Sequence, residues 1–221
     1  MFRLASAVIL AALTLATAGV GRSLACTTGK KVLLQTSFSF VDAAFGDQNA
    51  NFAIQDSSAL IKPSPQKYQM RLDSAFLFGD IDICVTVTPT DVGQAQVTSN
   101  GSLYYSAAGI VFWAQDYDNF YVLLLNSSGS FQIARKVSGN WVDPYPVDWT
   151  HEDALVQGVN KPNQIEIVAS GQSITVSING KAATELRAQM PSAPSLIGLF
   201  AESAKTSDTW KFNGLQITSV K

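Results

Sequence analysis

Two carboxylates separated by one residue, Asp80 and Asp82, are the closest approach in this sequence to a catalytic pair. A glycosidase needs two carboxyl groups that flank one sugar bond, and residues i and i+2 of a β-strand face the same side of a sheet. Both aspartates also stand where the apolar run from Ile81 to Val87 begins, which is typical of the polar edge of a strand. We therefore expect Asp80 and Asp82 to serve the fold and not catalysis.

A nucleophilic relay of the Ser-His-Asp type would have to use His151, because this is the only histidine in the chain. No G-x-S-x-G nucleophile elbow accompanies it. Zinc is excluded as well, since neither Cys26 nor Cys84 has a partner at metal-ligand spacing. The sequence therefore offers no residue that we assign to catalysis.

Three side chains with oxygen atoms stand close together at Asp116, Asp118 and Asn119. Such groups could ligate Ca²⁺ if backbone carbonyls or a second loop supplied the remaining ligands. Aspartate and asparagine are equally what a tight turn between two strands prefers. Apart from this weak calcium candidate we expect no cofactor.

Aromatic side chains indicate a ligand better than the carboxylates do. Sugars present apolar C–H faces, so their binding sites combine flat Trp and Tyr rings with groups that hydrogen-bond hydroxyls. If Phe112 points into the core, alternation along the strand turns its neighbour Trp113 outward. The alternative is that Trp113 and Tyr121 line the core and that Trp141 caps it. The predicted ligand-binding residues are Trp113, Tyr121, Arg135, Trp141 and Trp149.

These residues must be positioned by strands, because apolar residues recur with a period of two from Lys31 onward. Turn-forming residues separate the apolar runs, and Asn179-Gly180 is a strong hairpin signal. We predict an all-β fold in which residues 26–221 form one antiparallel two-sheet sandwich. The expected strands cover residues 32–34, 38–40, 68–72, 81–87, 109–114, 120–125, 131–136, 164–168, 173–178, 195–202 and 209–220.

Residues 137–162 depart from this rhythm. The segment is too long for a hairpin turn and contains Trp141, Trp149 and several prolines. Long loops of this kind usually have a function. We predict an irregular flap that contributes to the ligand site.

The first 25 residues have the composition of a secretory signal peptide. Arg3 precedes an uncharged run over residues 4–21, and Ser23-Leu24-Ala25 ends in small residues at positions −3 and −1 of a cleavage site. A membrane anchor is the alternative, but the apolar stretch is at the short limit for spanning a bilayer. We predict cleavage after Ala25 and a secreted or periplasmic protein.

The overall charge excludes two classes of partner. The 221 residues include 15 basic and 17 acidic side chains, a net charge of −2, and no Lys/Arg cluster. Nucleic acids and anionic membrane surfaces are bound through such clusters, so neither is an expected partner. No stretch after the signal peptide is long and apolar enough to span a bilayer, and we expect no membrane insertion after cleavage.

Cys26 and Cys84 are the only cysteines. In an oxidising compartment they could form one disulfide, worth about 4 kcal/mol in the chain-entropy model. Cleavage after Ala25 would make Cys26 the first residue, which a bacterial lipoprotein would carry as a lipidated cysteine. Lipoprotein signals prefer Leu at position −3, where this chain has Ser23. We favour the disulfide and keep lipidation as the alternative.

The run GIVFWAQDYDNFY, residues 109–121, is followed in order by Gly139-Asn140-Trp141, by residues 176–180 and by Trp210-x-Phe212. This series resembles concanavalin A-like jelly-roll domains, including laminin G-like modules and bacterial 3-keto-disaccharide hydrolase-like proteins. The resemblance implies a jelly-roll sandwich, which carries lectins, glycosidases and adhesive modules alike. The catalytic glucanases of this fold have Glu-x-Asp-x-(x)-Glu on one strand, whereas no Glu lies within ten residues of Asp80 or Asp82.

The sequence therefore predicts non-catalytic binding of a carbohydrate or glycoconjugate outside the cytoplasm. A surface built mainly from Ser, Thr, Asn and Gln forms hydrogen bonds without carrying charge, which suits a neutral glycan. A glycoside-cleaving enzyme is the first alternative. A structural or adhesive module without a small ligand is the second.

Overall fold

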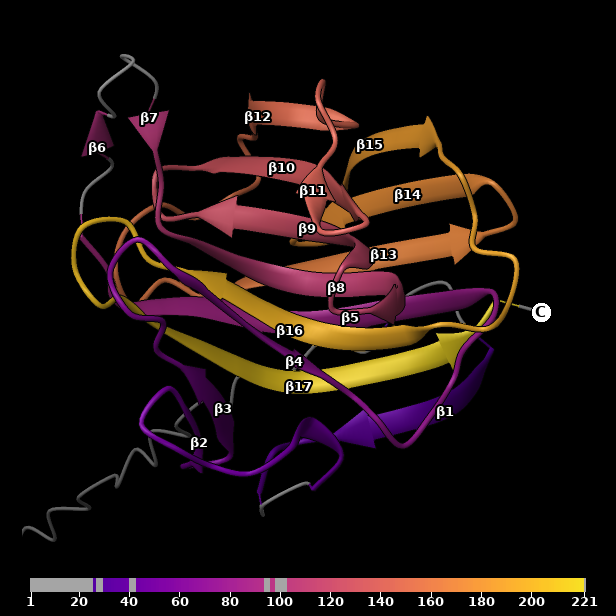
Figure 1. Cartoon of the computed structure of the whole chain (residues 1–221), viewed down its shortest axis with the longest axis horizontal. Helices are drawn as coiled ribbons and strands as arrows, with labels where there is room; N and C mark the ends of the chain where they lie inside the picture. The colour runs from indigo at the N-terminus through magenta and orange to yellow at the C-terminus, as the bar shows by residue number, and fades with distance from the viewer. Residues whose placement is uncertain (1–25, 27–29, 40–42, 94–95, 98–102, 221) are drawn as a thin grey trace, which may run out of the picture.

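The computed structural model describes residues 26, 30–39, 43–93, 96–97 and 103–220, except for the side chains of 96–97 and 103–104. The predicted signal peptide, residues 1–25, lies outside the described residues. Two antiparallel sheets lie face to face, and Figure 1 shows the seven-stranded sheet in front of the eight-stranded one. No helix among the described residues is long and apolar enough to cross a membrane.

The eight-stranded sheet contains both ends of the described chain. Its longest strands, β5 and β17, pair along most of their length and form the middle of the sheet. Its members in order are β15 (Lys181–Arg187), β14 (Ser173–Ile178), β13 (Asn163–Ser170), β5 (Ile81–Asp91), β17 (Thr209–Ser219), β3 (Ser58–Ile61) and β2 (Phe52–Gln55), with β1 (Lys31–Thr36) also paired to β17.

The seven-stranded sheet is built mainly from the middle of the chain. Two smaller elements accompany the sheets, a ribbon of β6 (Gln96–Val97) with β7 (Leu103–Tyr104) and a 3₁₀ turn, η1 (Ala43–Phe45). The members of the sheet in order are β11 (Asn140–Trp141), β10 (Ser130–Val137), β9 (Asn119–Asn126), β8 (Ala107–Asp116), β16 (Leu196–Glu202) and β4 (Tyr68–Leu72), with β12 (Val147–His151) also paired to β10.

This architecture confirms the predicted all-β two-sheet jelly roll. Most expected strands are present, but the strand expected over residues 38–40 is not, because Phe38 has φ +51° and turns its ring into the core. Residue 40 itself lies outside the described residues. The predicted flap is also more regular than expected, since it supplies β11 and β12, which both pair with β10.

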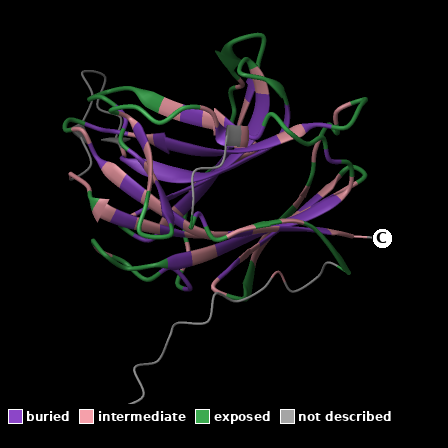
Figure 2. Cartoon of the chain, turned by 90° about the horizontal axis from the view of Figure 1, so that it is seen from below, coloured by how far each residue is buried: buried purple, intermediate pink, exposed green. Residues whose placement is uncertain are grey.

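The main core lies between the two sheets. Alternate residues of each strand face inward, as Ile81, Ile83, Val85 and Val87 do on β5. Trp210 is fully buried, and its indole N–H donates a hydrogen bond of 3.1 Å to Ser106 Oγ. Figure 2 shows buried residues along both layers and exposed residues gathered in the loops.

Alternation fails at Trp113. The pairing of β8 with β9 shifts register between Phe112 and Asp116, and Trp113 has φ +50°. This irregularity turns two consecutive rings to the same side, with the centroids of Phe112 and Trp113 5.8 Å apart. Trp113 and Tyr121 are both buried in the main core. Of the two alternatives for these residues, the structure has the one in which they line the core.

A second apolar cluster lies on the outer face of the seven-stranded sheet, the face turned away from the main core. It includes Phe120, Leu124 and Phe200, and Trp149 of the flap packs against it. The ring of Trp141 lies edge-on to Phe120 at 5.7 Å. The flap therefore folds over this outer face and shields part of it from water.

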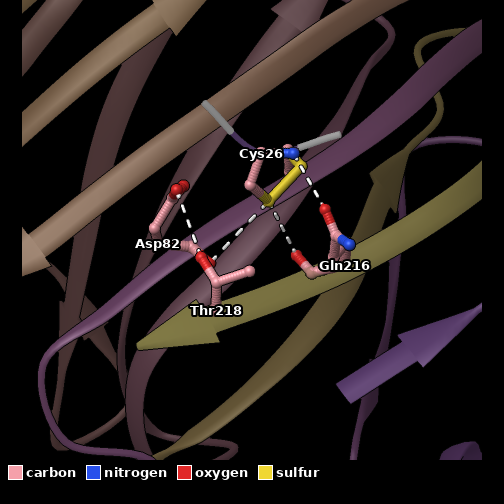
Figure 3. The surroundings of a disulfide bond; sticks show 5 residues. Cys26, Asp82, Gln216 and Thr218 are labelled. Carbon is pink, nitrogen blue, oxygen red and sulfur yellow. Dashed lines mark hydrogen bonds between the residues drawn. A yellow bond between two sulfur atoms is a disulfide. The ribbon is translucent and has the colours of Figure 1, made fainter. Parts of the chain in front are cut away.

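Cys26 and Cys84 form a disulfide, as predicted (Figure 3). Cys84 lies on β5 and is buried, and the backbone N–H of Cys26 donates a hydrogen bond of 2.9 Å to Gln216 Oε1 on β17. These two contacts fasten the first described residue to the middle of the eight-stranded sheet. The structure thus has the disulfide that the sequence favoured.

Candidate functional site

One candidate site is an open pocket of about 500 Å³ on the outer face of the seven-stranded sheet. Strands β4, β9, β10 and β16 form its floor, and the flap with β11 and β12 forms one wall. We call it the outer-face site. Its lining residues are Tyr68, Tyr105, Leu124, Gln132, Ala134, Trp141, Tyr145, Asp148, Trp149 and Glu202.

Aromatic rings dominate this pocket. Tyr68 stacks on the buried ring of Phe200 with centroids 5.0 Å apart, and the ring of Trp141 lies edge-on to it at 6.4 Å. Tyr105 and Trp149 form a second pair at 5.2 Å. Tyr68, Trp141 and Tyr145 keep 38–40% of their surface exposed. Rings that are held by neighbours and yet open to solvent can stack against an apolar ligand face.

Lys136 lies nearly buried beside these rings. Its Nζ donates a hydrogen bond of 2.9 Å to Tyr68 Oη and lies 3.6 Å from Asp118 Oδ1. The same Nζ is 5.3 Å from the ring centroid of Tyr68 and 5.9 Å from those of Phe120 and Trp141. Cation–π attraction and this hydrogen bond together hold Tyr68 and Trp141 in place.

Polar groups in the pocket accept and donate hydrogen bonds. Gln132 Nε2 donates to Asp148 Oδ1 at 3.3 Å, and the same oxygen accepts the backbone N–H of Trp149 at 2.7 Å. Burial raises the pKa of Tyr145, and the nearby carboxylates of Glu202 and Asp148 raise it further. The lining includes two acids and no Lys, Arg or His, so the outer-face site favours a ligand without negative charge.

The structure divides the five predicted ligand residues between two places. Trp141 and Trp149 line the outer-face site. Trp113, Tyr121 and Arg135 do not, because they face the other side of the same sheet. Consecutive residues of a strand point to opposite faces, and the predicted convergence on one face is therefore not found.

Trp113, Tyr121 and Arg135 instead line a second pocket, of about 410 Å³, at the edge of the sandwich. We call it the edge pocket. Arg135 lies over the ring of Tyr121 at 5.0 Å, and its Nη2 donates a hydrogen bond of 2.8 Å to Gln189 Oε1. Burial raises the pKa of Tyr121, while the Arg135 guanidinium opposes that rise. The other lining residues are Gln115, Asn119, Phe120, Lys136, Val137, Met190, Pro191 and Ser192.

Several residues of the outer-face site were not predicted. Tyr68 and Glu202 meet there because β4 pairs with β16, and their register places them opposite each other. Nothing in a local sequence window indicates that pairing. Tyr145 and Asp148 lie within the predicted flap, where the density of aromatic and proline residues was the available signal.

The candidate calcium ligands hold a turn between β8 and β9. Asp116 Oδ1 accepts the backbone N–H of Asp118 at 2.7 Å and the Asn119 amide at 2.9 Å. These hydrogen bonds lower the pKa of Asp116, the first of them most. Asn119 Oδ1 accepts the backbone N–H of Ser138 at 2.9 Å. Among the described residues no three acidic, His or Cys side chains gather as a metal site.

Asp82 lies on β5 of the eight-stranded sheet, and Asp80 comes directly before that strand. Neither lines the two pockets just described, but Asp80 lines a smaller pocket of about 190 Å³ that adjoins the edge pocket at Trp113 and Met190. Asp80 Oδ1 accepts the backbone N–H of Gly171 at 2.9 Å. Asp82 is completely buried and accepts a hydrogen bond from Thr218 Oγ1 at 3.3 Å (Figure 3). His151 lies on the surface, with Nε2 3.2 Å from Asp153 Oδ1.

No family model matches the chain, and no curated protein matches it either. Solved structures do match. The chain is similar to the carbohydrate-binding module CBM66 from Bacillus subtilis, with a TM-score of 0.55 and 14% identity, over 77% of this chain and 92% of that one.

Two further matches have comparable geometry. The catalytic domain of an endo-1,3-β-glucanase (laminarinase) from Thermotoga petrophila has a TM-score of 0.59 and 6% identity, over 85% of this chain and 96% of that one. The metal-free Emp46p carbohydrate recognition domain has a TM-score of 0.57 and 9% identity, over 84% and 98%. At such low identity these matches establish the fold alone, an antiparallel two-sheet β-sandwich.

Proposed function

We propose that the protein is a non-catalytic carbohydrate-binding protein and that its ligand lies in the outer-face site. The observation that carries this proposal is one open pocket in which exposed Tyr and Trp rings stand next to carboxylate and amide groups. Rings of this kind stack against the C–H faces of a sugar, while the polar groups bind its hydroxyls. Asp148 and Glu202 would repel an anion, so the favoured ligand is a neutral glycan.

The structural neighbours support the same class of ligand. Their names refer to a carbohydrate-binding module, a carbohydrate recognition domain and a glucanase. Because fold does not fix function, this support is secondary to the composition of the pocket. Among the proteins that the sequence resembles, the laminin G-like modules are the ones that would correspond to binding without catalysis.

The test is a glycan array followed by calorimetric titration of the strongest neutral ligand. Trp141→Ala removes an exposed ring of the outer-face site, and we expect an affinity loss of about tenfold or more, or roughly 1.4 kcal/mol per tenfold. Tyr117→Ala is the matched control, because Tyr117 is 56% exposed but lies outside the pocket. If Trp141→Ala and Tyr117→Ala both bind the glycan with the affinity of the wild-type protein, the proposal is contradicted. An array without any hit would favour an adhesive module instead.

A glycoside hydrolase is the second candidate, because Asp148 and Glu202 line the same pocket from β12 and β16. Two carboxyl groups around one sugar bond are what acid–base hydrolysis requires. This pair is independent of Asp80 and Asp82 and would belong to the 3-keto-disaccharide hydrolase-like side of the resemblance.

Chromogenic and 3-keto glycosides would test the second candidate. If the protein is a hydrolase, Asp148→Asn and Glu202→Gln should each abolish turnover while circular dichroism shows an intact fold. Asp153→Asn is the control, since Asp153 is an exposed acid outside the pocket. No turnover by the wild-type protein would remove this candidate.

We also propose that the protein acts outside the cytoplasm after cleavage following Ala25. The composition of residues 1–25 supports this, and a disulfide persists in oxidising compartments. Mass spectrometry of the mature protein should find an unmodified N-terminal Cys26 joined to Cys84. A diacylglyceryl group on Cys26 would contradict the proposal.

A further inference from the structure

The edge pocket has the opposite charge to the outer-face site. The guanidinium of Arg135 lines it and no Asp or Glu does, whereas the ammonium group of Lys136, also a lining residue, is directed to Tyr68 and Asp118. The protein as a whole carries a net charge of −2, so a basic pocket stands out against an acidic background. The two pockets share no lining residue. The edge pocket could therefore bind a ligand different from the glycan proposed for the outer-face site.

Arg135 is the group that gives this pocket its chemistry. Its guanidinium stacks on Tyr121 and donates one hydrogen bond, from Nη2 to Gln189 Oε1. Of the ion pairs found among the described residues, one joins Lys136 to Asp118, one joins His151 to Asp153, and neither involves Arg135. A guanidinium has five N–H donors in a planar fork. The fork is thus oriented by its neighbours and keeps donors for an external oxyanion.

The remaining walls of the pocket suit a ligand that carries more than an anion. Gln115, Gln189 and Ser192 bring amide and hydroxyl groups to its rim. Met190 adds apolar surface, since it is 46% exposed. Hydroxyl-binding groups next to apolar surface are the combination that a sugar ring requires. A small inorganic anion would leave most of the 410 Å³ unused.

We propose that the edge pocket is a second binding site, and that it binds an acidic sugar whose carboxylate pairs with Arg135. The ligand class is a uronic acid or an oligosaccharide that ends in one. The carboxylate lies in the guanidinium fork, and the ring hydroxyls contact the amides at the rim. This site goes beyond the proposed function, because it uses different residues and selects ligands of the opposite charge character.

Calorimetric or NMR titration with glucuronate and with glucose tests the proposal. We expect glucuronate to bind at least tenfold more tightly than glucose and its affinity to fall as salt is raised. Arg135→Gln should reduce glucuronate affinity at least tenfold, and Arg135→Lys should reduce it less, because the charge remains without the fork. Binding of both sugars with equal affinity would overturn the proposal.

Arg187→Gln is the matched control. Arg187 Nη2 also donates to a glutamine oxygen, Gln172 Oε1 at 3.1 Å, but Arg187 is exposed on β15 and lines neither pocket. Its substitution should leave glucuronate affinity unchanged. An equal loss in Arg187→Gln and Arg135→Gln would show a general charge effect and overturn the site.

Two further measurements distinguish a sugar site in the edge pocket from a simple oxyanion site and from binding in the outer-face site. Inorganic sulfate should displace glucuronate only at much higher concentration, and equally strong competition would mean an oxyanion site that does not recognise sugars. Trp141→Ala should leave glucuronate binding intact, because Trp141 belongs to the outer-face site. Loss of glucuronate binding in Trp141→Ala, but not in Arg135→Gln, would overturn the edge pocket and leave the outer-face proposal standing.

Discussion

The outer-face site and the edge pocket lie on opposite sides of the same strand, β10, and differ in almost every respect. The outer-face site is lined by acids and by rings that are partly open to solvent, whereas the edge pocket is lined by the guanidinium of Arg135 and by the buried rings of Trp113 and Tyr121. Arg135 and Lys136 are neighbours in the chain, yet Arg135 reaches Tyr121 and Lys136 reaches Tyr68. A single strand thus distributes alternate side chains to two chemically different places.

This contrast separates two uses of the same residue types. Trp113 is 4% exposed and belongs to the main core, while Trp141 is 38% exposed and packs at the rim of a pocket. Burial of a large ring contributes to folding stability, and an exposed ring contributes to binding. Sequence alone cannot distinguish the two, because both are tryptophans on strands of one sheet.

The largest expected effect concerns stability. Trp113→Ala should lower the free energy of unfolding by about 3–5 kcal/mol, because it leaves a cavity among close-packed rings. Trp141→Ala should cost about 1 kcal/mol, since much of its ring is already in water. Urea denaturation of both variants measures the difference. Equal costs would mean that the two tryptophans have the same role, and the contrast would be lost.

A smaller effect is expected at Lys136, whose ammonium group holds the rings of the outer-face site. Lys136→Met keeps the length of the side chain but removes the hydrogen bond to Tyr68 Oη and the charge beside Trp141. The lost interactions are worth about 1 kcal/mol, which corresponds to roughly a fivefold loss of affinity for the neutral glycan. Titration of this variant beside Trp141→Ala checks it. Unchanged affinity would mean that the rings keep their positions without the cation.

The smallest expected effect is on the pKa of one tyrosine in each pocket. It distinguishes the two pockets by the sign of the charge beside that tyrosine. Burial raises the pKa of Tyr121 and of Tyr145, but Arg135 opposes the rise at Tyr121 whereas Glu202 and Asp148 add to it at Tyr145. Arg135→Gln should therefore raise the pKa of Tyr121 further, and Glu202→Gln should lower that of Tyr145.

NMR titration of labelled tyrosines above neutral pH follows both pKa values. A phenol whose pKa is raised on folding binds its proton more tightly in the folded state, so its contribution to stability is complete below the unfolded pKa of about 10. That contribution is lost as the pH rises through the folded pKa. Shifts in the same direction in both variants would contradict the assigned charges of the two pockets.

Much of the fold could be predicted because it depends on local alternation. The inward positions of β5, the hairpin at Asn179-Gly180 and the single possible pair of cysteines are all readable in short windows. Phe38 was assigned to a strand because its neighbours alternate, although a backbone with φ +51° interrupts the pattern there. Local patterns indicate which residues are buried more reliably than they indicate backbone geometry.

The candidate sites were predicted only in part, because they depend on register and on irregularity. The shift in pairing after Phe112 turns Trp113 inward. No local sequence pattern indicates this shift. Tyr68 and Glu202 lie more than a hundred residues apart and meet only through the pairing of β4 with β16. The sequence did indicate Trp141 and Trp149, since both belong to a segment too long for a simple turn.

The pairing of β1 with β17 has a further consequence for how the molecule can be attached to something else. Lys31 lies opposite Ser219 in that pairing, and Lys30 N–H donates to the carbonyl of Ser219 at 2.9 Å. The first and last strands of the described chain therefore both lie in the eight-stranded sheet, whereas the outer-face site belongs to the seven-stranded one. A tether attached at β1 or at β17 would hold the protein by the eight-stranded sheet and leave the outer-face site, on the other sheet, facing away from the point of attachment.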